Sequence, residues 1–154
     1  MPAPLKIPRS VLVVIHSPDL HILLLERAAR AGYWQSVTGS VDTLDEPLGH
    51  AALREVEEET GLRPPASALR KWEVVNTFEI YPQWRHRFAP GTTHNTEHVY
   101  SVELPAPVPV RVSPGEHTDW RWLPWREAAT ACFSWTNRDA IRMLAARQGV
   151  HAPY

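Results

Sequence analysis

The chain contains little of several features that mark whole classes of proteins. It has one cysteine, Cys132, which excludes an internal disulfide and a zinc site built on cysteines. No apolar run approaches the roughly 18 residues of a membrane-spanning helix. The first ten residues lack the apolar core of a signal peptide. We therefore expect a protein of the cytoplasm that has no membrane partner.

Net charge is also nearly absent, because 16 Lys and Arg side chains stand against 17 Asp and Glu side chains, a formal charge of −1. Because the sequence also lacks a long basic run, it does not resemble a protein that binds nucleic acid mainly through the phosphates. Nothing in the composition indicates an obligate protein partner. The length of 154 residues predicts a single domain over 1–154, with 1–9 as a flexible leader.

The hydrophobic pattern predicts more strands than helices. Strands are expected over 10–15, 21–26, 34–37, 72–81, 98–104 and 119–123, and helices over 47–60 and 137–148. A turn at 17–19 would join the first two strands into a hairpin. The proline-rich segment 104–114 is expected to be an edge strand or a loop. Because helices and strands do not alternate regularly, the predicted fold class is α+β with a mixed sheet.

The helix predicted over 47–60 carries an unusual group of charges. Pro47 suits the first helical position, and Gly61 suits a left-handed cap at the other end. Three glutamates at i, i+3 and i+4 share one face of this helix: Glu55, Glu58 and Glu59. Their negative charges repel one another. They also lie toward the C-terminal end of the helix, where the helix dipole disfavours anions. A bound divalent cation such as Mg²⁺ would neutralise them, and the alternative is a solvated acidic face.

The same segment resembles a known motif. Residues 54–62 read Arg-Glu-Val-Glu-Glu-Glu-Thr-Gly-Leu, and they are similar to the Nudix box, which ends in Arg-Glu-apolar-x-Glu-Glu-x-Gly-apolar. The upstream glutamate of the box corresponds to Glu46, with seven residues between it and Arg54. One departure is visible, since six residues rather than five separate Gly39 from Glu46. We expect the extra residue to form a bulged loop over 42–45 that leaves the helical glutamates undisturbed.

This resemblance implies a Nudix fold, an α/β/α sandwich in which helices flank a mixed β-sheet. It also implies that Glu55 and Glu59 are the principal metal ligands, with Glu58 sharing the site. Arg54 would hold a carboxylate in position. Glu116 matches an acidic position that supplies a further ligand or base, although on the residues alone it is an ordinary loop carboxylate. The implied cofactor is Mg²⁺, with Mn²⁺ as the alternative.

Motifs outside the box narrow the resemblance. Segments 34–41, 85–91, 95–97 and 134–138 occur in the order found in the bacterial branch of the family that acts on dihydroneopterin triphosphate in folate biosynthesis. The resemblance implies hydrolysis of that small-molecule pterin triphosphate to dihydroneopterin monophosphate and pyrophosphate. Activity on nucleoside triphosphates is the first alternative, because the box is shared.

A triphosphate attached to a flat ring needs cations and an apolar slot. We predict substrate contacts from seven residues: Arg27, Trp34, Gly39, Arg85, Arg87, Asn95 and Trp135. Guanidinium groups match phosphate geometry, and tryptophan rings can stack on the pterin. Asparagine can read a ring edge or cap a turn. Each side chain also has an ordinary alternative, either as a surface charge or in the core.

A second alternative belongs to another functional class, a catalytically silent Nudix-like module that binds a nucleotide. Such a module should have lost carboxylates of the box, whereas this chain keeps all three on the predicted helical face. The sequence leaves open the number of metal ions, the phosphorus atom that is attacked, the carboxylate that acts as base and the oligomeric state.

Overall fold

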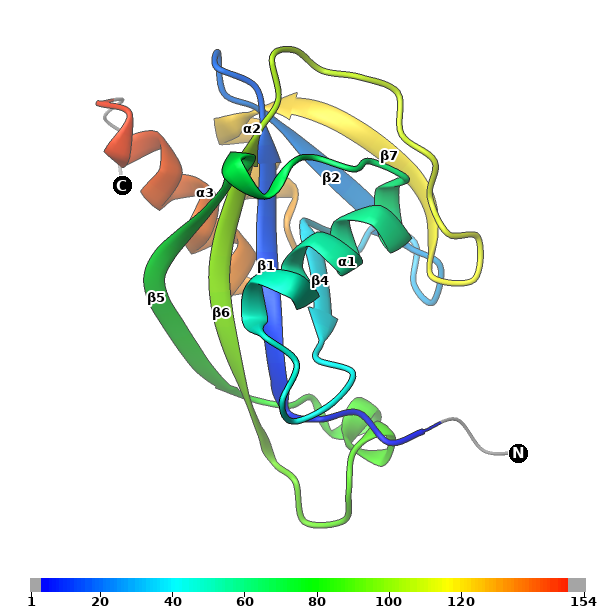
Figure 1. Ribbon diagram of the computed structural model, residues 1–154. Helices are drawn as coiled ribbons and strands as arrows, with labels where there is room; N and C mark the ends of the chain where they lie inside the picture. The colour runs from blue at the N-terminus through cyan, green and yellow to red at the C-terminus, as the bar shows by residue number, and fades with distance from the viewer. Residues whose placement is uncertain (1–3, 150–154) are drawn as a thin grey trace.

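A mixed seven-stranded sheet forms the centre of the computed structural model, which describes residues 4–149. In one half of the sheet, β1 (Arg9–His16) is parallel to β6 (His94–Glu103), and β6 is antiparallel to β5 (Leu69–Glu79). Strand β1 is almost completely buried because its side chains are apolar on both faces. It therefore holds the middle of the sheet (Figure 1).

On the other side of β1, the sheet divides into two branches. Strand β2 (His21–Arg27) meets β1 where His16 faces Ile22, and then it pairs with β3 (Trp34–Gln35) and β7 (His117–Pro124). Strand β4 (Val37–Ser40) takes the free edge of β1. The predicted hairpin is thus correct at its closed end, and its strands diverge beyond it.

The strand predicted over 34–37 is in fact two short strands that break at Ser36. The chain crosses there from the edge of β2 to the edge of β1. The backbone N–H of Ser36 donates to the side-chain oxygen of Asn137 at 2.8 Å instead of to a neighbouring strand. This side-chain bond compensates the backbone group that the break leaves unpaired.

Helices cover both faces of the sheet, so the predicted α/β/α sandwich is confirmed (Figure 1). Helix α1 (Leu48–Thr60) packs on Val11, Val13 and Ile15 of β1 through one apolar core. Helices α2 (Trp125–Ala131) and α3 (Trp135–Arg147) pack on the opposite face through a second core that contains Leu12 and Val14. The alternation along β1 decides which side chain enters which core.

Several boundaries differ from the prediction. Pro47 is the N-cap of α1, with φ −60° and ψ 137°, so the helix begins one residue later than predicted. Gly61 takes the expected left-handed conformation, with φ 75°. Segment 104–114, which the structure describes completely, forms a loop, and the indole N–H of Trp122 donates to the Val108 carbonyl.

Three short helices were not predicted: α2 and the 3-10 helices η1 (Ala66–Ala68) and η2 (Pro82–Arg87). Each is too short to show a clear helical period. Among the helices of residues 4–149, none is long and apolar enough to cross a membrane.

Candidate active site and metal centre

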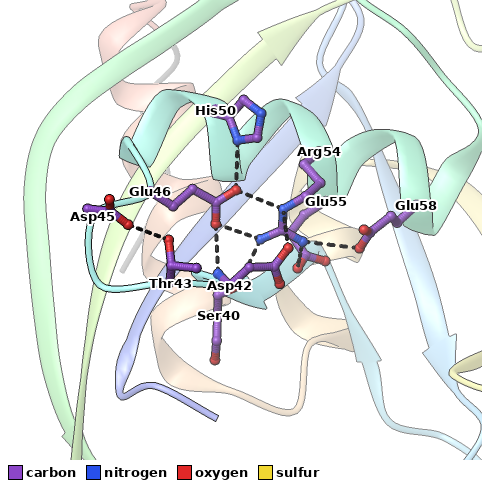
Figure 2. A network of polar contacts seen from close by, with 9 residues as sticks. All are labelled: Ser40, Asp42, Thr43, Asp45, Glu46, His50, Arg54, Glu55 and Glu58. Carbon is purple, nitrogen blue, oxygen red and sulfur yellow. Dashed lines mark hydrogen bonds and ion pairs between the residues drawn. The ribbon is translucent and has the colours of Figure 1, made fainter. Parts of the chain in front are cut away.

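Arg54 of α1 lies at the centre of a network of carboxylates (Figure 2). Its Nε and Nη2 donate to the two oxygens of Glu46 at 2.9 and 3.0 Å. Its Nη1 donates to Glu55 at 2.9 Å and reaches Glu58 at 3.2 Å. A further bond from Nη2 to the Ser40 carbonyl, at 3.0 Å, ties the helix to the end of β4. One guanidinium therefore joins the strand, the loop and the helix.

The extra residue before α1 lies in the loop, as predicted. Residues 42–45 form a bend and a turn, and α1 continues from Leu48 as a regular α-helix. Glu46 accepts hydrogen bonds from the backbone N–H of Asp42 and from Nδ1 of His50, both at 2.7 Å. The bonds from Arg54, followed by that from Asp42, lower the pKa of Glu46 to about 2. Glu46 thus pairs with Arg54 despite the longer loop.

Gly39 allows the Glu55 carboxylate to lie directly against the backbone of β4. A Cβ added at Gly39 would stand 2.0 Å from Cδ of Glu55, far inside van der Waals contact. Only glycine leaves this space open. Burial raises the pKa of Glu55 to about 7, and the negative charges of Glu58 and Glu116 act in the same direction, although Arg54 opposes them.

A second group of ligand atoms comes from Glu59, Glu116 and His117, which offer atoms within 4.8 Å of one another. Glu59 is 3% exposed, and one of its oxygens accepts a hydrogen bond from the Thr38 N–H at 3.2 Å. Burial raises the pKa of Glu59 well above its usual value, and the nearby charges of Glu55 and Glu116 raise it further. The carboxyl groups at this site are crowded together, and crowding and burial both disfavour the ionised forms of Glu55 and Glu59.

His117 was missed by the sequence reasoning. Its Nε2 lies 3.2 Å from the side-chain nitrogen of Gln35 and 3.8 Å from Glu59. Because Arg27 donates to the Gln35 oxygen at 3.3 Å, the Gln35 amide donates to Nε2 of His117, and the imidazole proton lies on Nδ1. Burial, together with Arg27, lowers the pKa of His117 to about 4, so the ring is neutral at pH 7. The available signal was its position directly after Glu116.

Two cations, Lys6 and Arg27, lie near these carboxylates, and Arg87 lies near both of them. Burial lowers the pKa of Lys6, and Arg87 and Arg27 lower it further, whereas Glu55 and Glu116 raise it. Arg27 shows the same pattern, since burial and Arg87 lower its pKa while Glu59 and Glu116 raise it. The backbone N–H of Lys6 donates to the Arg87 carbonyl at 2.8 Å, which joins the segment before β1 to the end of η2.

The predicted substrate residues divide between this site and other places. The structure brings Arg27 and Gly39 to the carboxylates and places Arg87 beside Arg27. Arg85 instead pairs with Glu79 and donates to the Ile80 carbonyl at 3.0 Å.

The remaining three lie near α3 or on its side of the sheet. The Trp34 ring is covered by Arg121, whose guanidinium carbon is 4.8 Å from the ring centre. Trp135 is 47% exposed at the first position of α3. Asn95 is buried and donates to Ser10 at 2.7 Å.

The arrangement has the composition of a cation-assisted phosphate site. Carboxylates of α1 and of the loop before β7 face one another, and the described neighbours of Glu59 include no arginine or lysine that hydrogen-bonds to it. Oxygen-rich groups of this kind suit hard divalent cations, which share their coordination with substrate phosphates. Lys6 and Arg27, which lie beside them, suit the phosphates themselves.

Comparison with known proteins gives a consistent result. The NUDIX domain family matches residues 6–144. The chain is 41% identical over 142 residues to the dihydroneopterin triphosphate diphosphatase of Escherichia coli strain K12, which covers 90% of this chain and 93% of that protein. It is 36% identical over 138 residues to the Haemophilus influenzae protein of the same name, covering 87% and 85%. The structure of the E. coli dihydroneopterin triphosphate pyrophosphohydrolase matches with a TM-score of 0.87 at 38% identity, covering 94% of this chain and 99% of that chain.

Proposed function

The chain belongs to the Nudix family and is a Nudix hydrolase, and from this premise we propose that it hydrolyses dihydroneopterin triphosphate to dihydroneopterin monophosphate and pyrophosphate. The relatives that carry this name align over nearly their whole length. The observation that carries the proposal is the meeting of the α1 carboxylates with Lys6 and Arg27 at one site. Such a site can hold a metal and a triphosphate together.

The carboxylates fit a divalent cation, for which we propose Mg²⁺, with Mn²⁺ as the alternative. The raised pKa values of Glu55 and Glu59 show that their negative charge is poorly compensated in the protein alone. Glu55, Glu59 and Glu116 would hold the ion. Glu58, whose side chain is 55% exposed, would contribute at the rim. When bound, the ion lowers the pKa of a coordinated water and offsets phosphate charge.

The chain's own residues would position the reactants. Lys6, Arg27 and Arg87 would bind the triphosphate, since Lys6 and Arg27 lie close to the carboxylate group and Arg87 lies beside both of them. Arg54 keeps the Glu55 carboxylate in place, and Gly39 leaves room for it. A carboxylate of this group would accept the proton of the attacking water, a role that general bases fill within hydrogen-bond reach.

The test is a product assay with purified protein, Mg²⁺ and a panel of pterin and nucleoside triphosphates. We expect pyrophosphate to leave as one unit, with the highest kcat/KM on dihydroneopterin triphosphate. Excess chelator should abolish turnover. Orthophosphate released one unit at a time would contradict the proposed bond cleavage. A higher kcat/KM on nucleoside triphosphates would overturn the substrate assignment while leaving the Nudix chemistry intact.

A further inference from the structure

A cluster of unpaired polar atoms lies within the protein, apart from the α1 carboxylates. Among the described residues, the buried side-chain atoms without a hydrogen-bond partner include Ser36 Oγ, Asn95 Oδ1 and Glu97 Oε1. We name these three residues, together with Asn76 of β5 and Thr136 of α3, the Glu97 cluster. The mechanism proposed above uses none of their side chains.

Sheet register brings most of the cluster together. Glu97 of β6 faces Asn76 of β5 and Ser10 of β1, and side chains at facing positions lie on the same side of a sheet. Asn95 lies two residues before Glu97, so it shares that side, and it donates to Ser10. Because Ser10 alternates with Val11 on β1, this is the side covered by α2 and α3.

The N-terminus of α3 completes the cluster. The side chain of Thr136 hydrogen-bonds to Glu97, and this bond lowers the pKa of Glu97. The next residue, Asn137, accepts the hydrogen bond from the Ser36 N–H. Ser36 therefore reaches the cluster at the break between β3 and β4.

Burial makes these unpaired atoms costly. Glu97 is 4% exposed, Asn95 is 6% exposed and Ser36 is fully buried. Each unpaired buried polar group costs about 1–3 kcal/mol, so a set of three needs an explanation. Burial also raises the pKa of Glu97 to about 7, and the polar side chains of Thr136 and Asn76 offset only part of that rise. A ligand that supplies hydrogen-bond partners would remove this cost.

The open atoms define the chemistry of such a ligand. Glu97 and Asn95 offer acceptors, the Asn76 amide has a second N–H beyond the one that faces Glu97, and the Ser36 hydroxyl can serve as either donor or acceptor. A complementary group presents adjacent N–H donors beside a carbonyl acceptor. The 2-amino-4-oxopyrimidine edge of a pterin has this pattern, with its ring N–H, amino group and carbonyl, and guanine shares it. Adenine and the common pyrimidines do not.

The cluster also lies at a suitable place relative to the phosphate site. Ser36 directly follows Gln35, whose side chain hydrogen-bonds to His117 in the carboxylate group. Consecutive Cα atoms are about 3.8 Å apart, so the two sites adjoin along the chain. An aromatic side chain lies beside the cluster, since Phe78 of β5 faces Asn95 of β6. A ring joined to phosphates by a short chain suits this spacing.

We propose that the Glu97 cluster binds the aminopyrimidinone edge of the substrate ring, with the Glu97 carboxylate accepting the ring N–H and the amino group. This inference rests on the proposed function, because it names the residues that would select a pterin triphosphate. It predicts that Glu97 affects recognition of the ring and leaves recognition of the phosphates unchanged.

The experiment measures inhibition of dihydroneopterin triphosphate hydrolysis by two fragments of the substrate. Neopterin represents the ring without phosphates, and pyrophosphate represents the phosphates without the ring. In Glu97→Gln, one acceptor oxygen becomes an NH₂ group that opposes the ring donors. We expect its inhibition constant for neopterin to rise about tenfold or more, while that for pyrophosphate stays within twofold. Glu103→Gln, the same change at an exposed position of β6, should match wild type.

A second variant guards against misfolding of the first. Ser36→Ala removes one open oxygen with little change in volume, and its inhibition constant for neopterin should rise about threefold to tenfold. The inference is overturned if both variants keep the wild-type constant for neopterin, or if both weaken pyrophosphate equally. Wild-type protein that fails to hydrolyse dihydroneopterin triphosphate would instead refute the proposed function, which this arrangement tests separately.

Discussion

Two groups of carboxylates, one at the start of α1 and one around Glu59, behave in opposite ways. Around Glu46, hydrogen bonds from Arg54, Asp42 and His50 compensate the negative charge, and the pKa of Glu46 falls to about 2. Around Glu59, burial and neighbouring carboxylates leave the charge uncompensated, and the pKa rises. The first group stabilises the fold by itself. The second group has an unfavourable electrostatic energy that a bound cation would reduce, which is typical of a functional site.

The largest expected effect comes from removing a charge at the uncompensated group. In Glu59→Gln, turnover with Mg²⁺ should fall on the order of 10²-fold or more, because both a ligand and a candidate base are lost. The free energy of unfolding should not fall, since burial already disfavours the ionised carboxylate. Steady-state kinetics, metal titration calorimetry and chemical unfolding would test this.

Glu57→Gln is the matched control for that variant, because Glu57 lies on the same helix and pairs with Arg63 at the surface. It should retain wild-type turnover. Full activity of Glu59→Gln with Mg²⁺ would remove the basis for assigning this group to metal binding.

Gly39 offers a way to disturb the site without removing any charge. In Gly39→Ala, the new Cβ would force the Glu55 carboxylate away from β4. We expect kcat to fall about tenfold to 100-fold, because small displacements of positioned groups are costly. Gly49→Ala is the control, since the nearest atom to its Cβ is a Leu69 methyl carbon at 3.8 Å and alanine favours a helix. Equal kinetics for both variants would show that the position of Glu55 does not matter.

The compensated group should affect stability instead. Glu46→Gln should lower the free energy of unfolding by about 1–3 kcal/mol at pH 7, because it weakens hydrogen bonds to a charged partner. The pKa of Glu46 is about 2 in the folded protein, against an ordinary value of 4.5. Its contribution is therefore complete above about pH 4.5 and is lost as the pH falls toward 2.

Chemical unfolding of wild type and Glu46→Gln at a series of pH values tests this sign. The difference between the two proteins should shrink as the pH falls through the window from 4.5 to 2. A difference that stays constant, or that grows in acid, would contradict the assignment of Glu46 as the compensated carboxylate.

The smallest effect is expected in the loop that joins the two halves of the site. Leu44 is 78% exposed, and its deletion leaves the stretch from Glu46 to Arg54 intact. Deleting Leu44 should keep metal-dependent activity within about tenfold, or ~1.4 kcal/mol in the barrier. A much larger loss, measured by kcat/KM, would mean that the loop itself positions the carboxylates.

Helical periodicity explains which parts of this site could be predicted from the sequence. Glu55 and Glu59 are one turn apart, so the pattern places them on one face wherever the helix packs. The strands of β1 and β2 were also evident, because their apolar runs are long and bounded by a turn. The extra loop residue was predicted correctly because an insertion within the helix would have changed the spacing of the glutamates.

Residues brought in by long-range pairing could not be predicted in this way. His117 reaches Glu59 because β7 pairs with β2, a register that no local pattern shows. Lys6 approaches the carboxylates because its backbone bonds to the end of η2. The break at Ser36 depends on a side chain of α3, which is 101 positions away. In each case the deciding contact lies far along the chain.

The buried position of Cys132 has a practical consequence for spectroscopy. It is the chain's single cysteine, and burial raises the pKa of its thiol to about 12, so thiol-reactive dyes should leave it unmodified in the folded protein. A thiol introduced by Leu44→Cys would be exposed beside the Glu46 end of α1. A fluorophore or spin label attached there could follow ion loading in real time, with the natural cysteine left in place.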